Sequence, residues 1–170
     1  MLDRLVGNSS LQVHAPELLE IIRNLQRNVD LLDTLPMVLT HNDFSQVNIL
    51  VNDVGNVTGV LDFDEAGIEA FGMCTWGLYE SFFGSMEDSR WSFYDEMPLL
   101  ADTFWVSLWA NVPSSLKKEE KEKAIKVSLS IGILNRYFIQ GMMNTIDLTS
   151  QVHRRSLEYA KGILPRIWGN

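Results

Sequence analysis

The chain has 170 residues, of which 46% are hydrophobic and 21% charged, enough for one globular domain with a moderate core. Its net charge of −8 disfavours nucleic acid, whose phosphates it would repel, and its apolar stretches are too short to cross a bilayer. The single cysteine, Cys74, excludes an internal disulfide, and the start at Met1–Leu5 lacks the apolar run of a signal peptide. These features predict a cytoplasmic protein.

The charge is unevenly distributed. Residues 1–110 hold 4 basic and 17 acidic side chains, a net of −13, whereas residues 111–170 hold 10 basic and 5 acidic, a net of +5. The acidic part favours a cationic ligand or a divalent metal, and an ordinary solvated acidic surface explains it equally well. Charge alone therefore does not decide the function.

The first predicted element is a helix over residues 16–34. Pro16 suits the first turn of a helix, where its missing N–H is not needed. Apolar residues then recur on one helical face at Leu18, Ile22, Leu25, Val29 and Leu32. Pro36 ends this helix, and residues 37–40 form a short apolar strand.

A β-hairpin follows, with strands at residues 49–51 and 57–61 joined by the polar turn 52–56. Helical spacing then returns near residues 74–84, 98–111, 117–143 and 150–162, with breaks at 113 and 144–149. The prediction is an α+β fold dominated by helices. Within one domain we distinguish a helical segment at 1–36, a hairpin region at 37–64 and a helical body at 65–170.

The stretch most informative about chemistry surrounds this hairpin. It begins His41-Asn42-Asp43, reaches Asn48 before the first strand, and resumes after the second strand as Asp62-Phe63-Asp64. Phosphoryl transfer needs a carboxylate near the acceptor hydroxyl and oxygen ligands for Mg²⁺, and this spacing is that of kinases. Because antiparallel strands return the chain to its start, Asp43, Asn48 and Asp62 are expected to converge in one acidic cleft.

These motifs resemble those of the aminoglycoside phosphotransferase and choline kinase family, whose catalytic loop often has Asn or Gly where protein kinases have Arg. The run from Thr58 to Gly67 resembles the metal-binding segment of that family. The continuation from Phe71 to Glu80 is similar to a poorly characterised branch common in fungi. The resemblance covers about residues 36–84 and implies the C-terminal lobe of the protein-kinase-like fold, with the hairpin carrying the catalytic and metal loops.

The resemblance implies roles for three residues. Asp43 corresponds to the catalytic base or acceptor-orienting carboxylate, and Asn48 and Asp62 correspond to the ligands of the Mg²⁺ that accompanies ATP. Asp64 takes the position of a protein-kinase glycine, and its role stays open. His41 is expected to be structural, bonding to the backbone beneath the loop.

Other candidate residues have ordinary explanations. Asp53, Ser45 and Gln46 are interpreted as solvated loop residues, and His14, His153 and Cys74 as bystanders. Four tryptophans could form an aromatic box for a cationic substrate, but the i,i+4 spacing of two of them favours core packing; the four are Trp76, Trp91, Trp105 and Trp109.

The resemblance breaks before residue 37. Residues 1–36 contain no lysine and no glycine-rich loop, so the nucleotide-gripping N-terminal lobe of a kinase is expected to be absent and ATP binding to be weak. Three interpretations stay open: a catalytic lobe that transfers phosphate from ATP to a small-molecule acceptor, with the acidic charge favouring a cationic one; a non-catalytic, pseudokinase-like binding module; and a helical interaction protein with a vestigial motif. Without that lobe, apolar side chains of the hairpin are expected to be uncovered and to cause self-association, unless the helix from Pro16 folds over them; they are Ile49, Leu50, Val60 and Leu61.

Overall fold

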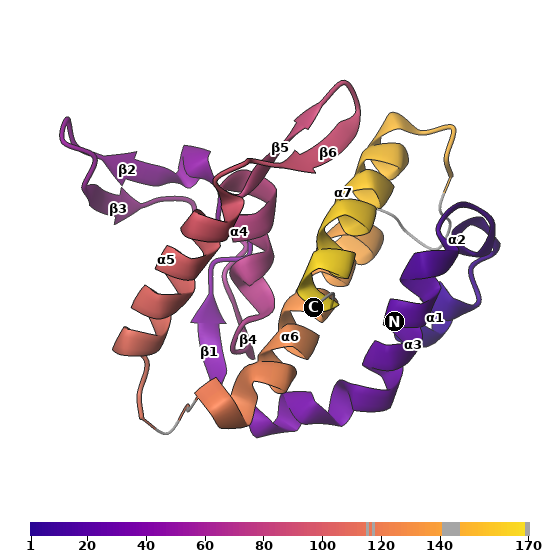
Figure 1. Cartoon of the computed structure of the whole chain (residues 1–170), viewed down its shortest axis with the longest axis horizontal. Helices are drawn as coiled ribbons and strands as arrows, with labels where there is room; N and C mark the ends of the chain where they lie inside the picture. The colour runs from indigo at the N-terminus through magenta and orange to yellow at the C-terminus, as the bar shows by residue number, and fades with distance from the viewer. Residues whose placement is uncertain (115, 117, 141–146, 169–170) are drawn as a thin grey trace.

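The computed structural model describes residues 1–114, 116, 118–140 and 147–168. Figure 1 shows two sides: long helices on the right, and short strands with two further helices on the left. The chain starts on the helical side with α1 (Leu2–Val6), α2 (Ser9–His14), α3 (Pro16–Asn28) and the 3-10 helix η1 (Val29–Thr34). The predicted helix at 16–34 is therefore confirmed, with its last six residues wound more tightly.

The helical side holds the main core. Helix α6 (Lys118–Asn135) and helix α7 (Gln151–Trp168) pack against each other and against α3. The predicted helices at 117–143 and 150–162 are confirmed over 118–140 and 151–162, and residues 117 and 141–146 lie outside the described residues. The most deeply buried apolar side chains of this core come from all three helices: Leu18, Ile22, Leu25, Val127, Ile133, Leu134, Ile163 and Leu164.

The predicted hairpin is confirmed. Strands β2 (Ile49–Val51) and β3 (Val57–Val60) pair antiparallel, with Ile49 opposite Val60. In the turn, the Asn52 side-chain oxygen accepts hydrogen bonds from the backbone N–H of Val54 and Asn56, at 3.2 and 2.9 Å. Gly55 has a φ of +84°, which glycine adopts without steric cost. The turn therefore has a local chemical cause that is readable in the sequence.

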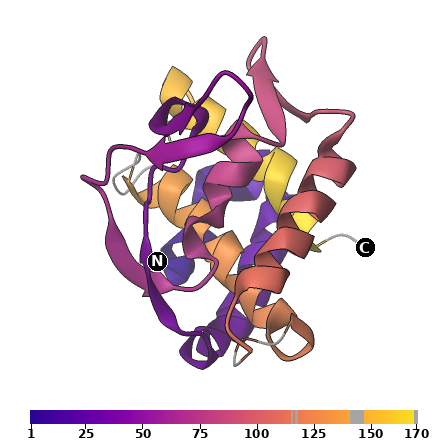
Figure 2. The same cartoon turned by 90° about the vertical axis from the view of Figure 1, so that its left-hand side faces the viewer.

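The predicted strand at 37–40 is also confirmed, as β1 (Met37–Thr40). Its partner, β4 (Gly67–Ala70), was not expected; the two run antiparallel, with Thr40 opposite Gly67. This pairing fixes where the loop after β1 starts and where the loop before β4 ends, because Thr40 and Gly67 are paired at the same end of the ribbon. Figure 2 shows the β1–β4 ribbon and the β2–β3 hairpin on one face of the molecule.

The predicted helix near 74–84 is wrong at its end. The 3-10 helix η3 (Met73–Thr75) leads into α4 (Trp76–Ser81), after which the chain forms a second hairpin from β5 (Gly84–Glu87) and β6 (Arg90–Phe93). Its two-residue turn uses left-handed Asp88 and Ser89, with φ of 46° and 62°, rather than glycine or asparagine. The usual turn signal is therefore missing from the sequence.

Helix α5 (Met97–Asn111), predicted at 98–111, completes the left side. The described residues thus form a mostly helical chain with three two-stranded antiparallel sheets, consistent with the α+β expectation. The alternative in which α3 covers the hairpin is wrong, because α3 packs against α1, α2, α6 and α7 on the opposite side.

Candidate functional site

The loop that follows β1 is held from below by His41. The buried His41 ring contacts the Leu61 carbonyl through Nε2 at 2.6 Å and accepts the Asp43 backbone N–H at Nδ1, at 3.3 Å. Because Nδ1 accepts, the ring proton lies on Nε2 and is donated to Leu61. The same ring packs edge-on against Phe63, with centroids 4.6 Å apart. His41 therefore ties the loop before the hairpin to the loop after it, the structural role expected from the sequence.

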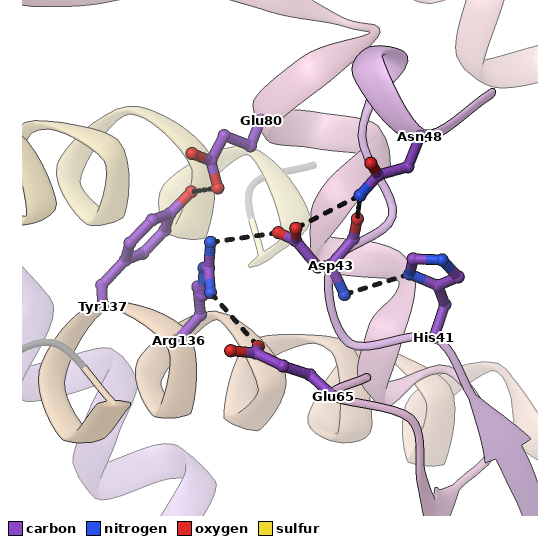
Figure 3. A network of polar contacts seen from close by, with 7 residues as sticks. All are labelled: His41, Asp43, Asn48, Glu65, Glu80, Arg136 and Tyr137. Atoms are coloured by element: carbon purple, nitrogen blue, oxygen red, sulfur yellow. Dashed lines mark hydrogen bonds and ion pairs between the residues drawn. The ribbon is translucent and has the colours of Figure 1, made fainter. Parts of the chain in front are cut away.

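Asp43 is held on both carboxylate oxygens. The Asn48 side-chain amide donates to Asp43 Oδ2 at 3.2 Å and to the Asp43 backbone carbonyl at 2.9 Å. The Arg136 guanidinium donates to Asp43 Oδ1 at 3.3 Å (Figure 3). Asp43 and Asn48 thus meet directly, and Asp43 has one partner on each side.

Asp62 lies beside Asn48 along the backbone. The Leu61 N–H donates to the Asn48 carbonyl at 2.8 Å, which brings the Asp62 backbone close to the end of the catalytic-type loop. Asp62 itself is left-handed, with a φ of 62°, and its exposed carboxylate has no hydrogen-bond or ion-pair partner among the described residues. Asp64 is exposed as well, and it has no hydrogen-bond or ion-pair partner among the described residues.

The donors available here suit a hard cation only in part. The Asn48 amide NH₂ faces Asp43, which leaves its oxygen as a ligand, and the Asp62 carboxylate is unengaged. The described residues contain no cluster of three His, Cys, Asp or Glu side chains that could hold a metal alone. Mg²⁺ commonly binds through one or two protein oxygens and completes its shell with waters and substrate phosphates. Asn48 and Asp62 fit that mode.

Arg136 is the residue that the sequence analysis missed. It begins the π-helical turn η4 (Arg136–Gln140) that follows α6, and such turns are frequent at functional sites. Its guanidinium carbon lies 4.7 Å from the centre of the Trp76 ring, and Nη1 lies 3.9 Å from Glu65. The signal in the sequence was a lone charge in the mostly apolar stretch from Ile131 to Phe138.

A second polar contact lies next to it. The Tyr137 hydroxyl donates to Glu80 at 2.9 Å (Figure 3). Burial raises the pKa of Glu80, while the Tyr137 hydrogen bond and the Arg136 charge oppose that rise. Burial also raises the pKa of Tyr137 well above its usual value, and the Glu80 charge adds to the rise. Near Asp43 there is therefore a second carboxyl group, that of Glu80, whose ionisation is disfavoured by burial.

A pocket of about 590 Å³ opens beside Arg136. Its walls are Arg136 and Tyr137 from η4, Glu65 and Glu80, and one face of α7; the residues from α7 are Val152, Arg155, Ser156 and Tyr159. The rings of Tyr137 and Tyr159 stack in parallel, with centroids 5.1 Å apart. Ligand pockets in proteins usually have volumes of about 300–1,000 Å³, so this one suits a small molecule.

The four candidate tryptophans lie in separate places. Trp76 lies under Arg136, and Trp91 packs against Tyr159. Trp105 and Trp109 stack on each other, with centroids 6.4 Å apart, and line another pocket of about 290 Å³ between α5, α6 and α7. No contact joins all four into one aromatic box within the described part of the chain, and packing accounts for most of them, as expected.

Three of the remaining candidates have their own contacts away from the Asp43 carboxylate. The Gln46 amide donates to the Ser81 carbonyl, and His153 accepts the Asp147 N–H at 2.8 Å. Cys74 is half-buried in an apolar pocket, where burial raises the pKa of its thiol. These contacts favour structural roles.

Comparison with known proteins gives one match. Residues 2–82 match the model of the phosphotransferase enzyme family. This match supports a phosphotransferase-type, kinase-like protein, and it contains Asp43, Asn48 and Asp62, whereas Arg136 lies beyond it. No curated protein and no solved structure matches the chain. No helix within the described residues is long and apolar enough to span a membrane.

Proposed function

We propose that this chain is a catalytic lobe of the phosphotransferase family that transfers the γ-phosphoryl group of ATP to the hydroxyl of a small molecule. The observation that carries the proposal is the position of Asp43. One carboxylate oxygen accepts from Asn48, which precedes the hairpin, and the other accepts from Arg136, which lines the 590 Å³ pocket. A base placed between a phosphate side and an acceptor side is what phosphoryl transfer requires.

In this reaction the acceptor hydroxyl approaches Asp43 from the pocket. Its oxygen forms a bond to the γ-phosphorus, its proton passes to the Asp43 carboxylate, and the bond from that phosphorus to the bridging oxygen breaks, releasing ADP. Asn48 holds Asp43 in place through Oδ2 and, with Asp62, offers oxygens to Mg²⁺. When bound, Mg²⁺ would neutralise negative charge on the phosphates.

Nucleotide affinity is expected to be low for this chain alone. Residues 1–36 fold as helices, and they provide no lysine or glycine-rich loop for the phosphates. We therefore expect weak ATP binding and weak Mg²⁺ or Mn²⁺ binding, measured by calorimetric titration. Micromolar affinity for ATP would contradict this expectation.

The single Cys74 supports a cytoplasmic location.

The test of the function is a matched pair of variants. We expect transfer from ATP to a hydroxylated probe, followed by ³¹P NMR with Mg²⁺, to fall by about 100- to 10,000-fold in Asp43→Asn, as for loss of a general base. Asp53→Asn makes the same chemical change in the exposed hairpin turn and should have no effect. Asp62→Asn should abolish the broadening of Asn48 resonances by Mn²⁺.

The competing function is a non-catalytic binding module, favoured by the helical residues 1–36. It predicts binding of a small molecule in the 590 Å³ pocket without phosphoryl transfer under any of these conditions. If the transfer rate is the same background rate in Asp43→Asn and in Asp53→Asn, transfer does not depend on Asp43, and that alternative is established.

A further inference from the structure

The charged side chains that line the 590 Å³ pocket differ in whether they have a close polar partner. Glu65 lies 3.9 Å from the Arg136 guanidinium, and Glu80 accepts the Tyr137 hydroxyl at 2.9 Å. Burial also raises the pKa of Glu80 and so disfavours its negative charge. Glu80 therefore has a hydrogen-bond donor already, and Glu65 has an ion-pair partner.

Arg155 is different. It is exposed on α7 and lines the pocket beside Tyr159. Burial raises the pKa of Tyr159, and a hydrogen bond with Arg155 and the Arg155 charge oppose that rise. In the described part of the chain its guanidinium forms no ion pair within 4 Å, although its charge acts on the nearby Glu80 and lowers the pKa of that carboxyl. A guanidinium without a close carboxylate partner, in a pocket of this size, leaves room for an anionic ligand group.

Arg136 places the same sign of charge at the inner end of the pocket. Its guanidinium is fixed on three sides, by the Trp76 ring, Asp43 and Glu65, and its side chain keeps 30% of its exposure. A carboxylate can accept about four hydrogen bonds, so a hydroxyl can still reach Asp43 Oδ1 beside Arg136. Any group next to that hydroxyl would then contact Arg136, which repels an ammonium and attracts an anion.

We infer that the pocket between η4 and α7 binds a hydroxylated small molecule that carries an anionic oxygen group, a carboxylate or a phosphate, recognised by Arg136 and Arg155. The identification of this molecule as the acceptor rests on the proposed function; its binding does not. The inference differs from the cationic acceptor that the acidic composition suggested, because Arg136 occupies the space beside Asp43 that an ammonium would need.

The test uses four probes with related skeletons and the full chain, without ATP or metal. Glycerate and glycerol 3-phosphate carry the anionic group, glycerol is neutral, and ethanolamine is cationic. Binding is followed by ¹⁵N NMR at the Nε–H resonances of Arg136 and Arg155. We expect both resonances to shift with at least one anionic probe at millimolar concentration, and not with glycerol or ethanolamine. A response to only one anionic probe identifies the carboxylate or the phosphate.

Matched variants separate the site from net charge. Arg155→Gln should weaken binding of the anionic probe at least about tenfold. Arg154→Gln makes the same change one residue earlier on α7, where the guanidinium donates to the Leu148 and Thr149 carbonyls, and it should leave the affinity unchanged. Arg136→Gln should weaken binding similarly; since it also loosens Asp43, the exposed Arg155 variant carries the decision if the Arg136 variant does not fold.

Three results would overturn the inference: no shift with either anionic probe, an equal response to ethanolamine, or equal losses in the Arg154 and Arg155 variants. Failure of the proposed function is distinguishable from these. Anion binding without phosphoryl transfer would leave this inference standing and remove the enzymatic function. Transfer to ethanolamine or glycerol without anion binding would do the reverse.

Discussion

The helical side and the strand side of the molecule bury their apolar residues very differently. On the helical side, Leu25 of α3 is 0% exposed, and its neighbours on α6 and α7 are buried as deeply. On the strand side, Leu39 of β1 and Ile68 of β4 are cross-strand partners, and they are 67% and 63% exposed. The helical side thus supplies the stability, whereas the strand side positions Asp43, Asn48 and Asp62 with little core of its own.

The candidate site lies where the two sides meet. Asp43 comes from the strand side, and Arg136 and Tyr137 come from the end of α6 (Figure 3). The comparison teaches that the loop containing Asp43 depends on the helical side for the contact between Asp43 and Arg136. The following predictions test this division of roles, beginning with the largest effect.

The largest expected effect is in the helical core. Leu25→Ala should lower the free energy of unfolding by about 2–5 kcal/mol, because it removes buried methyl groups and leaves a cavity. Leu39→Ala removes the same atoms from an exposed position and should change it by less than about 0.5 kcal/mol. Urea unfolding followed by circular dichroism measures both, and similar losses would break the comparison.

The next largest effect is expected where the loop between β1 and β2 contacts α4. A Cβ added at Gly77 would meet the Phe44 carbonyl, so Gly77→Ala must displace either the helix or the loop. We expect a loss of about 1–3 kcal/mol, typical of overpacking, together with shifted Asp43 and Asn48 NMR signals. Gly7→Ala is the control, because its Cβ would lie at an ordinary 3.6 Å from the Asp3 carbonyl. Unchanged loop signals in Gly77→Ala would show that α4 does not support the loop.

A smaller effect concerns pH. Burial raises the pKa of Glu80 in the folded chain above its ordinary value of 4.5, so the folded state binds this proton more tightly than the unfolded state. The stabilisation by that proton is complete below pH 4.5 and is lost as pH rises through the raised pKa. Relative to the wild type, Glu80→Gln should therefore gain stability as pH rises over that range, because glutamine has no proton to lose.

Glu80→Gln keeps an acceptor for the Tyr137 hydroxyl, which isolates the effect of the charge. Denaturant unfolding at a series of pH values measures the difference from the wild type. Exposed Glu87→Gln controls for the loss of a carboxylate elsewhere. A difference that does not change with pH would contradict the role of burial at Glu80.

The last prediction concerns self-association, and its variant should have the smallest effect on the free energy of unfolding. We expect the exposed β1–β4 face to cause self-association, and Ile68→Lys to reduce the mass measured by sedimentation equilibrium and the binding of a hydrophobic dye. Its effect on unfolding should stay within about 0.5 kcal/mol. Val13→Lys, on α2 at 72% exposure, is the control on the helical side. A wild-type protein that is monomeric and binds no dye would contradict the expected self-association. It would show that the exposed β1–β4 face needs no partner.

Local chemistry made part of this architecture predictable. The Asn52 turn, Pro16 at the start of α3 and the order of His41, Asp43 and Asn48 are all readable over a few residues. The hairpin at β5 and β6 was not predictable in that way, since its turn lacks glycine and asparagine. In β6, Phe93 packs against Tyr79 of α4, and Trp91 packs against Tyr159 of α7, which lies far along the chain.

The sequence by itself determined the two polar loops and the hairpin between them, because turn chemistry and antiparallel pairing act between near neighbours. Only the tertiary structure decided what faces Asp43 from the other side. Arg136 lies 93 residues further along the chain, and Tyr137 lies 57 residues from Glu80. No local periodicity encodes such contacts, since they exist only after α6 packs beside α4 and a π-helical turn directs Arg136 and Tyr137 toward the loop.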